Sequence, residues 1–166
     1  MCAIRILSRM QGNPIFMEQA IALATENVTS GRGGPFGAVI VRDGQIVATG
    51  VNLVTATNDS TAHGEIVAIR NACTALKSFQ LKGCQLYTSC EPCPMCLAAI
   101  YWARCDAIFY GSSAADAAAA GFDDAFLYEE MKRPIDERKI PTMNLLPEKA
   151  ISSFIAWRAQ AGRIDY

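Results

Sequence analysis

The order of apolar and polar positions along the chain predicts alternating helices and strands. Apolar residues recur at helical spacing between Asn13-Pro14, a pair typical of a helix start, and Gly31. Two runs rich in β-branched residues, Gly37–Val41 and Ile46–Val51, flank Asp43-Gly44, which favours a two-residue hairpin turn. The start of the chain therefore predicts one helix followed by a β-hairpin.

The middle of the chain continues this alternation. A helix with one apolar face follows the loop that ends at Thr61, and a short strand spans Cys84–Tyr87. The next helix opens at Pro92-Cys93-Pro94 and runs to Ala103, before a strand at Ala107–Tyr110. Because strands separated by a helix run parallel through right-handed crossovers, we expect parallel strands in this part of the sheet.

The last part of the chain predicts helices around one more strand. Ala114–Ala120 and Asp123–Met131 are expected to be short helices, and the charged segment Lys132–Pro141 a surface connection. A fifth strand is expected at Thr142–Leu146, and a final helix begins at Pro147.

These elements predict an α/β fold of three layers (αβα), with a mixed five-stranded sheet and helices on both faces. The 166 residues show no linker and no internal repeat, and this length is typical of one domain. We expect a single domain over residues 1–166, in which residues 1–13 form an N-terminal extension and residues 147–166 a C-terminal helix and tail.

Composition narrows the class of protein. Hydrophobic residues make up 51% and charged residues 19%, which excludes a disordered chain. The formal net charge is -1, whereas a domain that holds a phosphate backbone is usually basic, so no nucleic-acid partner is expected. No apolar run approaches the ~20 residues that cross a bilayer, and the apolar stretch near Met1 is too short for a secretory signal. We expect a cytoplasmic protein without a membrane partner.

Two short motifs carry metal-binding chemistry. His63-Gly64-Glu65 and Cys93-Pro94-Met95-Cys96 each open a predicted helix, and these helix starts should meet at the carboxyl edge of the sheet. Cys93 and Cys96 share one helical face, where the helix N-terminus favours thiolates. With His63, the only histidine of the chain, they predict one zinc ion per chain with a fourth position open to water, which is typical of catalytic sites.

Glu65 predicts what such a zinc site does. It lies two positions after His63 and so points in another direction on the helix, which makes it a neighbour of the open position rather than a ligand. There a carboxylate can take a proton from the attacking water and pass it to a leaving group. The pattern H-x-E with P-C-x-x-C is the signature of zinc nucleobase deaminases.

Other interpretations of the cysteines explain less. A lone C-x-x-C motif is also typical of redox pairs, and Cys90, Cys93 and Cys96 could begin an iron–sulfur motif, but Ile100 occupies the place of its fourth cysteine. A closed four-cysteine zinc site that recruits Cys84 and Cys90 would leave the His-x-Glu motif unused. A catalytic zinc site accounts for both motifs together.

Longer stretches surround these motifs: Gly33–Val41, Asn58–His63, Tyr87–Cys96, Ala99–Arg104, Gly121–Tyr128 and Arg163–Tyr166. In them the chain resembles the cytidine-deaminase-like zinc hydrolases and, among these, the bacterial guanine deaminases, over most of Phe16–Tyr166. Gly121–Tyr128 and the C-terminal Arg163–Tyr166 distinguish this group from the tRNA adenosine deaminases that share the zinc motif. One position departs from the family pattern, since Gly64 stands where alanine is usual.

The resemblance implies hydrolysis of guanine to xanthine and ammonia, with a free purine base as the substrate. By matching position, Asn52 would hydrogen-bond the purine and Asp124 would accept from its N–H edge. Phe36 and Trp102 would pack against the ring faces, although both also fit the role of core aromatics. The family also implies a homodimer and a C-terminal segment that closes the pocket, where Tyr166 would contribute to its own or to the partner's site.

Two other functions stay open at this point. The chain could deaminate another nucleobase, a nucleoside, an aminoheterocycle or tRNA adenosine, or it could be a non-catalytic zinc module. Glu65 discriminates between the classes, because only an enzyme needs this carboxylate.

Overall fold

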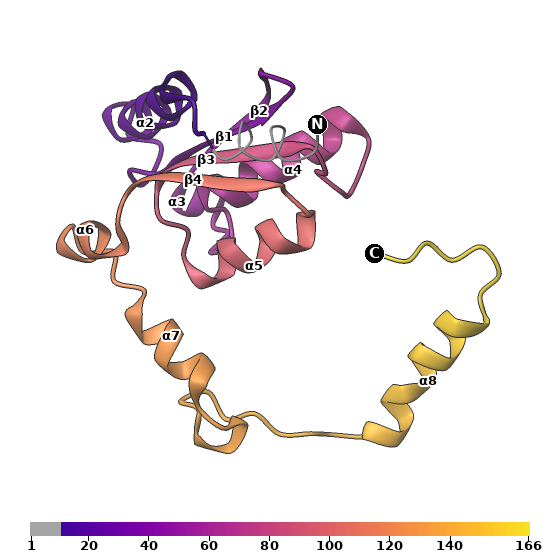
Figure 1. The fold of residues 1–166 in the computed structure, drawn as a ribbon. Helices are drawn as coiled ribbons and strands as arrows, with labels where there is room; N and C mark the ends of the chain where they lie inside the picture. The colour runs from indigo at the N-terminus through magenta and orange to yellow at the C-terminus, as the bar shows by residue number, and fades with distance from the viewer. Residues whose placement is uncertain (1–10) are drawn as a thin grey trace. The chain divides into compact units, whose positions relative to one another are not determined.

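We describe residues 11–166 in a computed structural model (Figure 1). Residues 1–10 of the expected N-terminal extension lie outside the described residues. Contacts divide the chain into two units, one that ends at Asp124 and one that comprises Ala125–Tyr166, and each is described by itself. That the chain forms a single domain stays a prediction.

The first helix, α2 (Pro14–Thr29), begins where the sequence predicts. The Asn13 side chain accepts a hydrogen bond from the Ile15 N–H at 3.0 Å, which caps the helix start. Pro14 occupies the first helical position, where its missing N–H costs nothing. The helix ends shortly before Gly31, whose φ of 71° redirects the chain toward the sheet.

The sheet of the first unit has four strands in the order β2-β1-β3-β4. These are β1 (Gly37–Arg42), β2 (Gln45–Val51), β3 (Cys84–Cys90) and β4 (Ala107–Ser112). β1 pairs antiparallel with both β2 and β3, whereas β3 and β4 pair parallel. β2 and β3 therefore run in the same direction with β1 between them, and the expected mixed sheet with parallel crossovers is confirmed.

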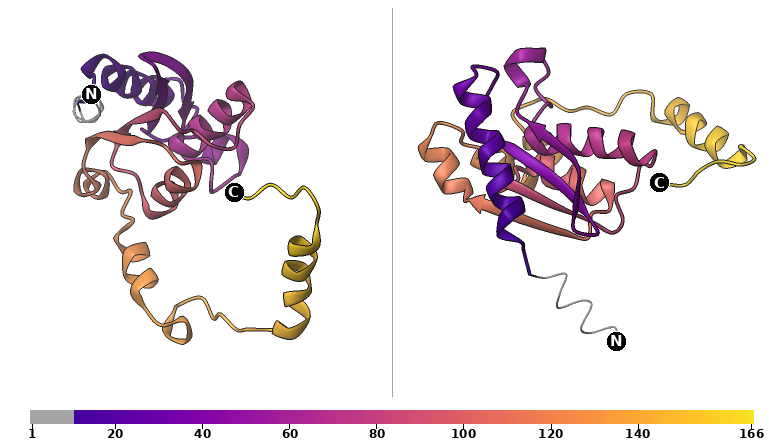
Figure 2. Two further views of the ribbon diagram at one scale, coloured as in Figure 1. Left: turned by 45° about the vertical axis from the view of Figure 1, so that its right-hand side comes forward. Right: turned by 90° about the horizontal axis from the view of Figure 1, so that it is seen from above.

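Helices cover this sheet on two faces (Figure 2). Ile40 and Leu86 belong to the buried cluster shared with α4 (Gly64–Leu76) and α5 (Pro94–Ala103). Val39 and Tyr87, their immediate neighbours in the strands, belong to the cluster shared with α2. Successive side chains of a strand point to opposite faces, so the continuous apolar run of β1 supplies both clusters.

The prediction of a fifth strand at residues 142–146 is wrong. Among residues 11–166 this segment has no regular secondary structure and joins no sheet. Met143 and Leu145 are 85% and 82% exposed, so the apolar side chains of this segment have no layer to pack against. A strand needs a neighbour to pair its N–H and C=O groups, and periodicity alone does not supply one.

Shorter helices complete the two units. In the first unit, α3 (Val54–Thr57) precedes the loop before α4, and α6 (Ala114–Ala119) starts with a capping box between Ser113 and Asp116. The second unit contains α7 (Ala125–Lys132), the 3-10 turn η1 (Ile135–Glu137) and α8 (Pro147–Ala159). Among the described residues, no helix combines the length and the apolar character that a membrane span requires.

Candidate active site

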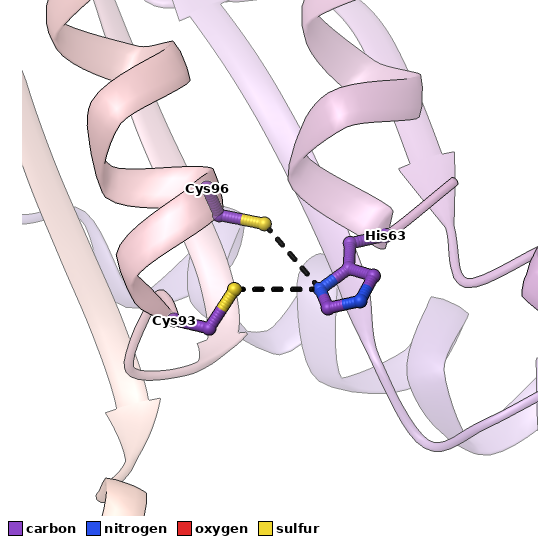
Figure 3. A group of neighbouring side chains, drawn as sticks. All are labelled: His63, Cys93 and Cys96. Carbon is purple, nitrogen blue, oxygen red and sulfur yellow. Dashed lines mark hydrogen bonds between the residues drawn. The ribbon is translucent and has the colours of Figure 1, made fainter. Parts of the chain in front are cut away.

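Three potential metal ligands meet where two helices begin (Figure 3). His63 is the residue that caps α4, Cys93 caps α5, and Cys96 lies in the first turn of α5. The His63 Nδ1 atom lies 3.5 Å from the Sγ atoms of both Cys93 and Cys96. α4 follows β2 and α5 follows β3, so the predicted meeting of the two helix starts is confirmed.

The geometry of these donors fits a zinc ion. All three ligand atoms lie within 4.8 Å of one another. Zn–S bonds of ~2.3 Å and Zn–N bonds of ~2.0–2.1 Å at a tetrahedral angle would place nitrogen and sulfur about 3.5 Å apart. The observed separations of 3.5 Å therefore match the edges of a zinc tetrahedron, with three protein ligands and one position left open.

The two thiols have opposite proton affinities without metal. Hydrogen bonds from Cys96 and His63 lower the pKa of Cys93 to about 4. The pKa of Cys96 is raised, because this thiol donates to Cys93 and is buried. The pKa of His63 is raised by its bond with Cys93. The metal-free site is therefore a thiolate held by two protonated neighbours, which must release protons when zinc binds.

Glu65 lies beside this group in the first turn of α4. Its side chain is 5% exposed, and its Oε1 atom accepts a hydrogen bond from the Thr88 hydroxyl at 3.2 Å. Burial raises the pKa of the carboxyl, so Glu65 can hold a proton closer to neutral pH than an exposed glutamate.

A cavity of about 250 Å³ opens over His63, Glu65 and Cys93. The other lining residues are Phe36, Asn52, Cys90, Glu91, Ala114, Ala117, Gly121, Phe122, Asp123 and Asp124. Four of the lining side chains are carboxylic acids, and no lysine or arginine of the described residues is among them. The cavity therefore favours a neutral ligand with N–H donors over a phosphorylated one.

The cavity contains three of the five expected substrate contacts. Phe36, Asn52 and Asp124 line it, and desolvation raises the pKa of Asp124. Trp102 is 62% exposed on α5 and is absent from the lining, so the structure does not bring it to the cavity of its own chain. Tyr166 belongs to the second unit, where its ring meets Trp157 edge-on. Contacts from Trp102 and Tyr166 to a substrate stay predictions.

A buried amide that the sequence analysis did not single out holds the loop around Asn52. The Asn27 Nδ2 atom donates to the carbonyl oxygens of Gly34 at 2.9 Å and Asn52 at 2.8 Å. The Asn52 N–H donates to the Phe36 carbonyl oxygen at 3.0 Å, and its Oδ1 accepts the Val54 N–H at 3.3 Å. These bonds leave the Asn52 side-chain N–H groups for a ligand. Asn27 could have been found from the sequence, because it lies seven positions after Ala20 on the buried face of α2, where a polar side chain needs a hydrogen-bond partner.

The glycine of the His-x-Glu motif lies close to the backbone of Phe36. A Cβ atom at Gly64 would lie 3.2 Å from the Phe36 carbonyl oxygen and 3.4 Å from its carbonyl carbon. An alanine here would make a tight contact that a small backbone shift relieves, so the glycine gives Phe36 slightly more room beside the first turn of α4.

Comparison with known proteins places this geometry in a family. The family model of the cytidine and deoxycytidylate deaminase zinc-binding region matches residues 10–112. The chain belongs to this family. The match contains His63, Glu65, Cys93 and Cys96, which supports zinc as the metal of the three-ligand group.

Within this deaminase family, similarity to a guanine deaminase extends over nearly the whole chain. Guanine deaminase of Bacillus subtilis (strain 168) is 55% identical over 151 residues, which cover 91% of this chain and 97% of that protein. A crystal structure of that deaminase gives a TM-score of 0.91 at 53% identity, covering 94% of this chain and 99% of the other. The structure of guanine deaminase from Nitrosomonas europaea gives a TM-score of 0.64 at 30% identity, covering 69% and 66%. By contrast, the tRNA-specific adenosine deaminase of Bacillus subtilis is 37% identical over 62% of this chain and 63% of its own.

The low pKa of Cys93 predicts selective alkylation of the metal-free deaminase. At about 4, this pKa lies well below the ~8.5 of an ordinary thiol, so Cys93 stays a thiolate as pH falls from 8 to 5 and is protonated only near pH 4. Iodoacetamide at pH 6 should label Cys93, while Cys73, whose pKa is raised by burial, stays unlabelled. Peptide mass spectrometry measures both, and added zinc should protect Cys93. If the labelling of Cys93 and Cys73 declines together as the pH falls below 8, the low pKa of Cys93 is contradicted.

Proposed function

We propose that the chain catalyses the hydrolysis of guanine to xanthine and ammonia. The observation that carries this proposal is the 55% identity to a guanine deaminase over 91% of this chain and 97% of that protein, which includes residues beyond the zinc-binding region. The cavity supports it, because Asn52 and Asp124 line the same space as the metal group.

The six cysteines of residues 11–166 are free thiols, and thiolate ligands persist in a reducing compartment, so we propose that the enzyme is cytoplasmic.

The proposed reaction divides between the metal and Glu65. Zinc held by His63, Cys93 and Cys96 supplies a nucleophile from water at neutral pH. Glu65 takes a proton from the attacking water and delivers it to the ring nitrogen beside C2. Glu65 then takes the remaining proton of the hydroxyl now bonded to C2 and passes it to the exocyclic nitrogen. The bond between C2 and that nitrogen breaks, ammonia leaves, and the hydroxyl oxygen becomes the C2 carbonyl of xanthine. The raised pKa of the buried carboxyl suits this exchange, because the protonated and ionised forms are both accessible.

Recognition of the base is assigned to three side chains of the cavity. The Asn52 amide donates to acceptors of the purine, and the Asp124 carboxylate accepts from its N–H edge. The Phe36 ring packs against the purine, and its own position is fixed by an edge-on contact with Phe122 at 4.9 Å between ring centroids. A base that lacks the N–H groups would leave the partly buried Asp124 carboxylate without this partner, which penalises such analogues. Trp102 is left out of this assignment.

We also propose a homodimer in which residues 147–166 dock on the second copy. β4 ends the sheet order, so one of its edges is unpaired among the described residues. Beside it lies an apolar groove lined by Ile21, Val28, Gly111 and others. α8 exposes a complementary set of large apolar side chains: Ile151, Phe154 and Ile155. Exposed apolar surface of this extent is typical of an interface. In such a dimer, Tyr166 could reach the cavity of the partner.

The role of Glu65 is tested by Glu65→Gln. The amide keeps the shape but cannot carry the proton, so ammonia release from guanine should fall by about 10²–10⁴-fold. Zinc content by atomic absorption should stay at one ion per chain, whereas the matched Cys96→Ser variant should lose zinc. The assay also includes adenine, cytosine, guanosine and an anticodon stem-loop. A wild-type enzyme that deaminates one of these and not guanine would refute the proposed substrate.

Recognition of the base is tested by Asn52→Ala and Asp124→Asn. Asn52→Ala removes the proposed donor. Asp124→Asn removes the negative charge and replaces one acceptor oxygen by an NH2 donor, so in both variants kcat/KM should fall by about 10–100-fold, which corresponds to about 1.4–2.8 kcal/mol, while zinc stays bound. Asp123→Asn is the control, because Asp123 also lines the cavity and has no proposed bond to the base. Retained zinc with unchanged kinetics in both variants would show that the two residues were wrongly assigned.

The dimer is tested by Phe154→Asp, which places a charge on the apolar face of α8, where Phe154 is 66% exposed. Sedimentation equilibrium should show a dimer for the wild type and a dimerisation constant weakened at least about tenfold for the variant. Ser153→Asp adds the same charge at the neighbouring position and should have a smaller effect. A wild type that is monomeric at micromolar concentration, or equal effects of the two variants, would overturn the proposal.

A further inference from the structure

Thr88 is a buried polar residue of β3. It pairs with Ala38 of β1 and with Tyr110 of β4, so the ladders on both sides fix its backbone. Strand alternation places it on the same face as Leu86, which belongs to the buried cluster beneath α4 and α5. Its side chain is 1% exposed. A buried hydroxyl at this position needs a partner, and an aliphatic side chain would fill the space without one.

The partner of this hydroxyl is the carboxylate of Glu65. Thr88 Oγ1 donates to Glu65 Oε1 at 3.2 Å, and both residues are buried. Cys96 also lies close to Glu65, and this neighbouring carboxyl raises the pKa of its thiol in the metal-free site. As a zinc ligand, however, Cys96 is a thiolate and has no proton to donate. The Thr88 hydroxyl is then the side-chain donor that continues to hold Glu65.

We propose that Thr88 is a positioning residue for Glu65. Its hydrogen bond fixes Oε1, and with it the rotation of the carboxylate, so that Oε2 carries the proton between water and the base. Proton transfer needs the heavy atoms within ~2.6–3.2 Å, and a misplacement of about 1 Å can cost about 10²-fold in rate. Because Thr88 is paired on both sides in the sheet and Glu65 lies in the first turn of α4, this bond ties the carboxylate to the sheet. The inference rests on the proposed function of Glu65.

The bond has a consequence that a structural role of Thr88 would not have. A hydroxyl needed only for folding would change stability and leave the turnover of folded, zinc-loaded protein unchanged. A hydroxyl that orients Glu65 acts on the chemical step, so its loss should lower kcat while KM, set by Asn52, Asp124 and Phe36, stays nearly constant.

The test compares Thr88→Val, which keeps the shape and removes the donor, with Thr88→Ser, which keeps the donor. Thr88→Val should lower kcat for guanine about 10–100-fold, change KM by less than about threefold and retain one zinc per chain. Thr88→Ser should recover kcat to within about threefold of the wild type. Thr49→Val, in the same sheet but in β2, is the matched control and should leave kcat unchanged. Crystal structures of zinc-loaded wild type and Thr88→Val should show Glu65 turned from its position in the variant alone.

Three results would overturn the inference: an unchanged kcat in Thr88→Val, an equal loss in Thr88→Ser, or loss of zinc from Thr88→Val. Failure of the proposed function gives a different result, namely a wild type that releases no ammonia from guanine. In that case the two crystal structures still decide the inference, because an unmoved Glu65 carboxylate in Thr88→Val would refute it.

Discussion

The site depends on two helices that begin at the same edge of one sheet. β2 and β3 run in the same direction, so α4 and α5 both start where these strands end and deliver His63 and Cys93 to one point. The 3.5 Å separations between nitrogen and sulfur follow from this arrangement rather than from any local motif. Each ligand lies at a helix N-terminus, where the dipole favours thiolate over thiol. The start of two helices at one edge of the sheet thus accounts both for the meeting of the metal ligands and for their thiolate chemistry.

Around the metal ligands, hydrogen bonds hold buried polar side chains in fixed positions. Glu65 loses almost all contact with water, which raises its pKa, and Thr88 holds one of its oxygens. Asn27 holds the carbonyl oxygens of Gly34 and Asn52, so the loop that forms one wall of the cavity is attached to α2. In each case a polar side chain replaces an apolar one inside a packed layer. Such groups are stable only when their hydrogen bonds are made, and those bonds in turn define where a ligand can be held.

Sequence patterns predicted the structure correctly where residues close in sequence favour the same turn or helix start that the tertiary structure contains. The cap at Asn13, the hairpin at Asp43-Gly44 and the first turns after His63 and Cys93 are all set by residues close in sequence. The prediction of a fifth strand at residues 142–146 was wrong, because a strand needs a partner and no described strand pairs with this segment. Trp102 does not line the cavity of its own chain, and its contact with a substrate stays a prediction, since a match of motif does not state which way a helix face turns.

The sequence by itself determined the chemistry: three ligands of the types and spacing that zinc prefers, a carboxylate beside them, and the family to which they belong. Only the tertiary structure decided which groups from distant strands and helices support that chemistry. Thr88 is 23 positions from Glu65, and Asn27 is 25 positions from Asn52, so neither pair has a signature along the chain. Hydrogen bonds between such residues arise when layers pack, because packing alone sets the distance between groups that no local periodicity relates.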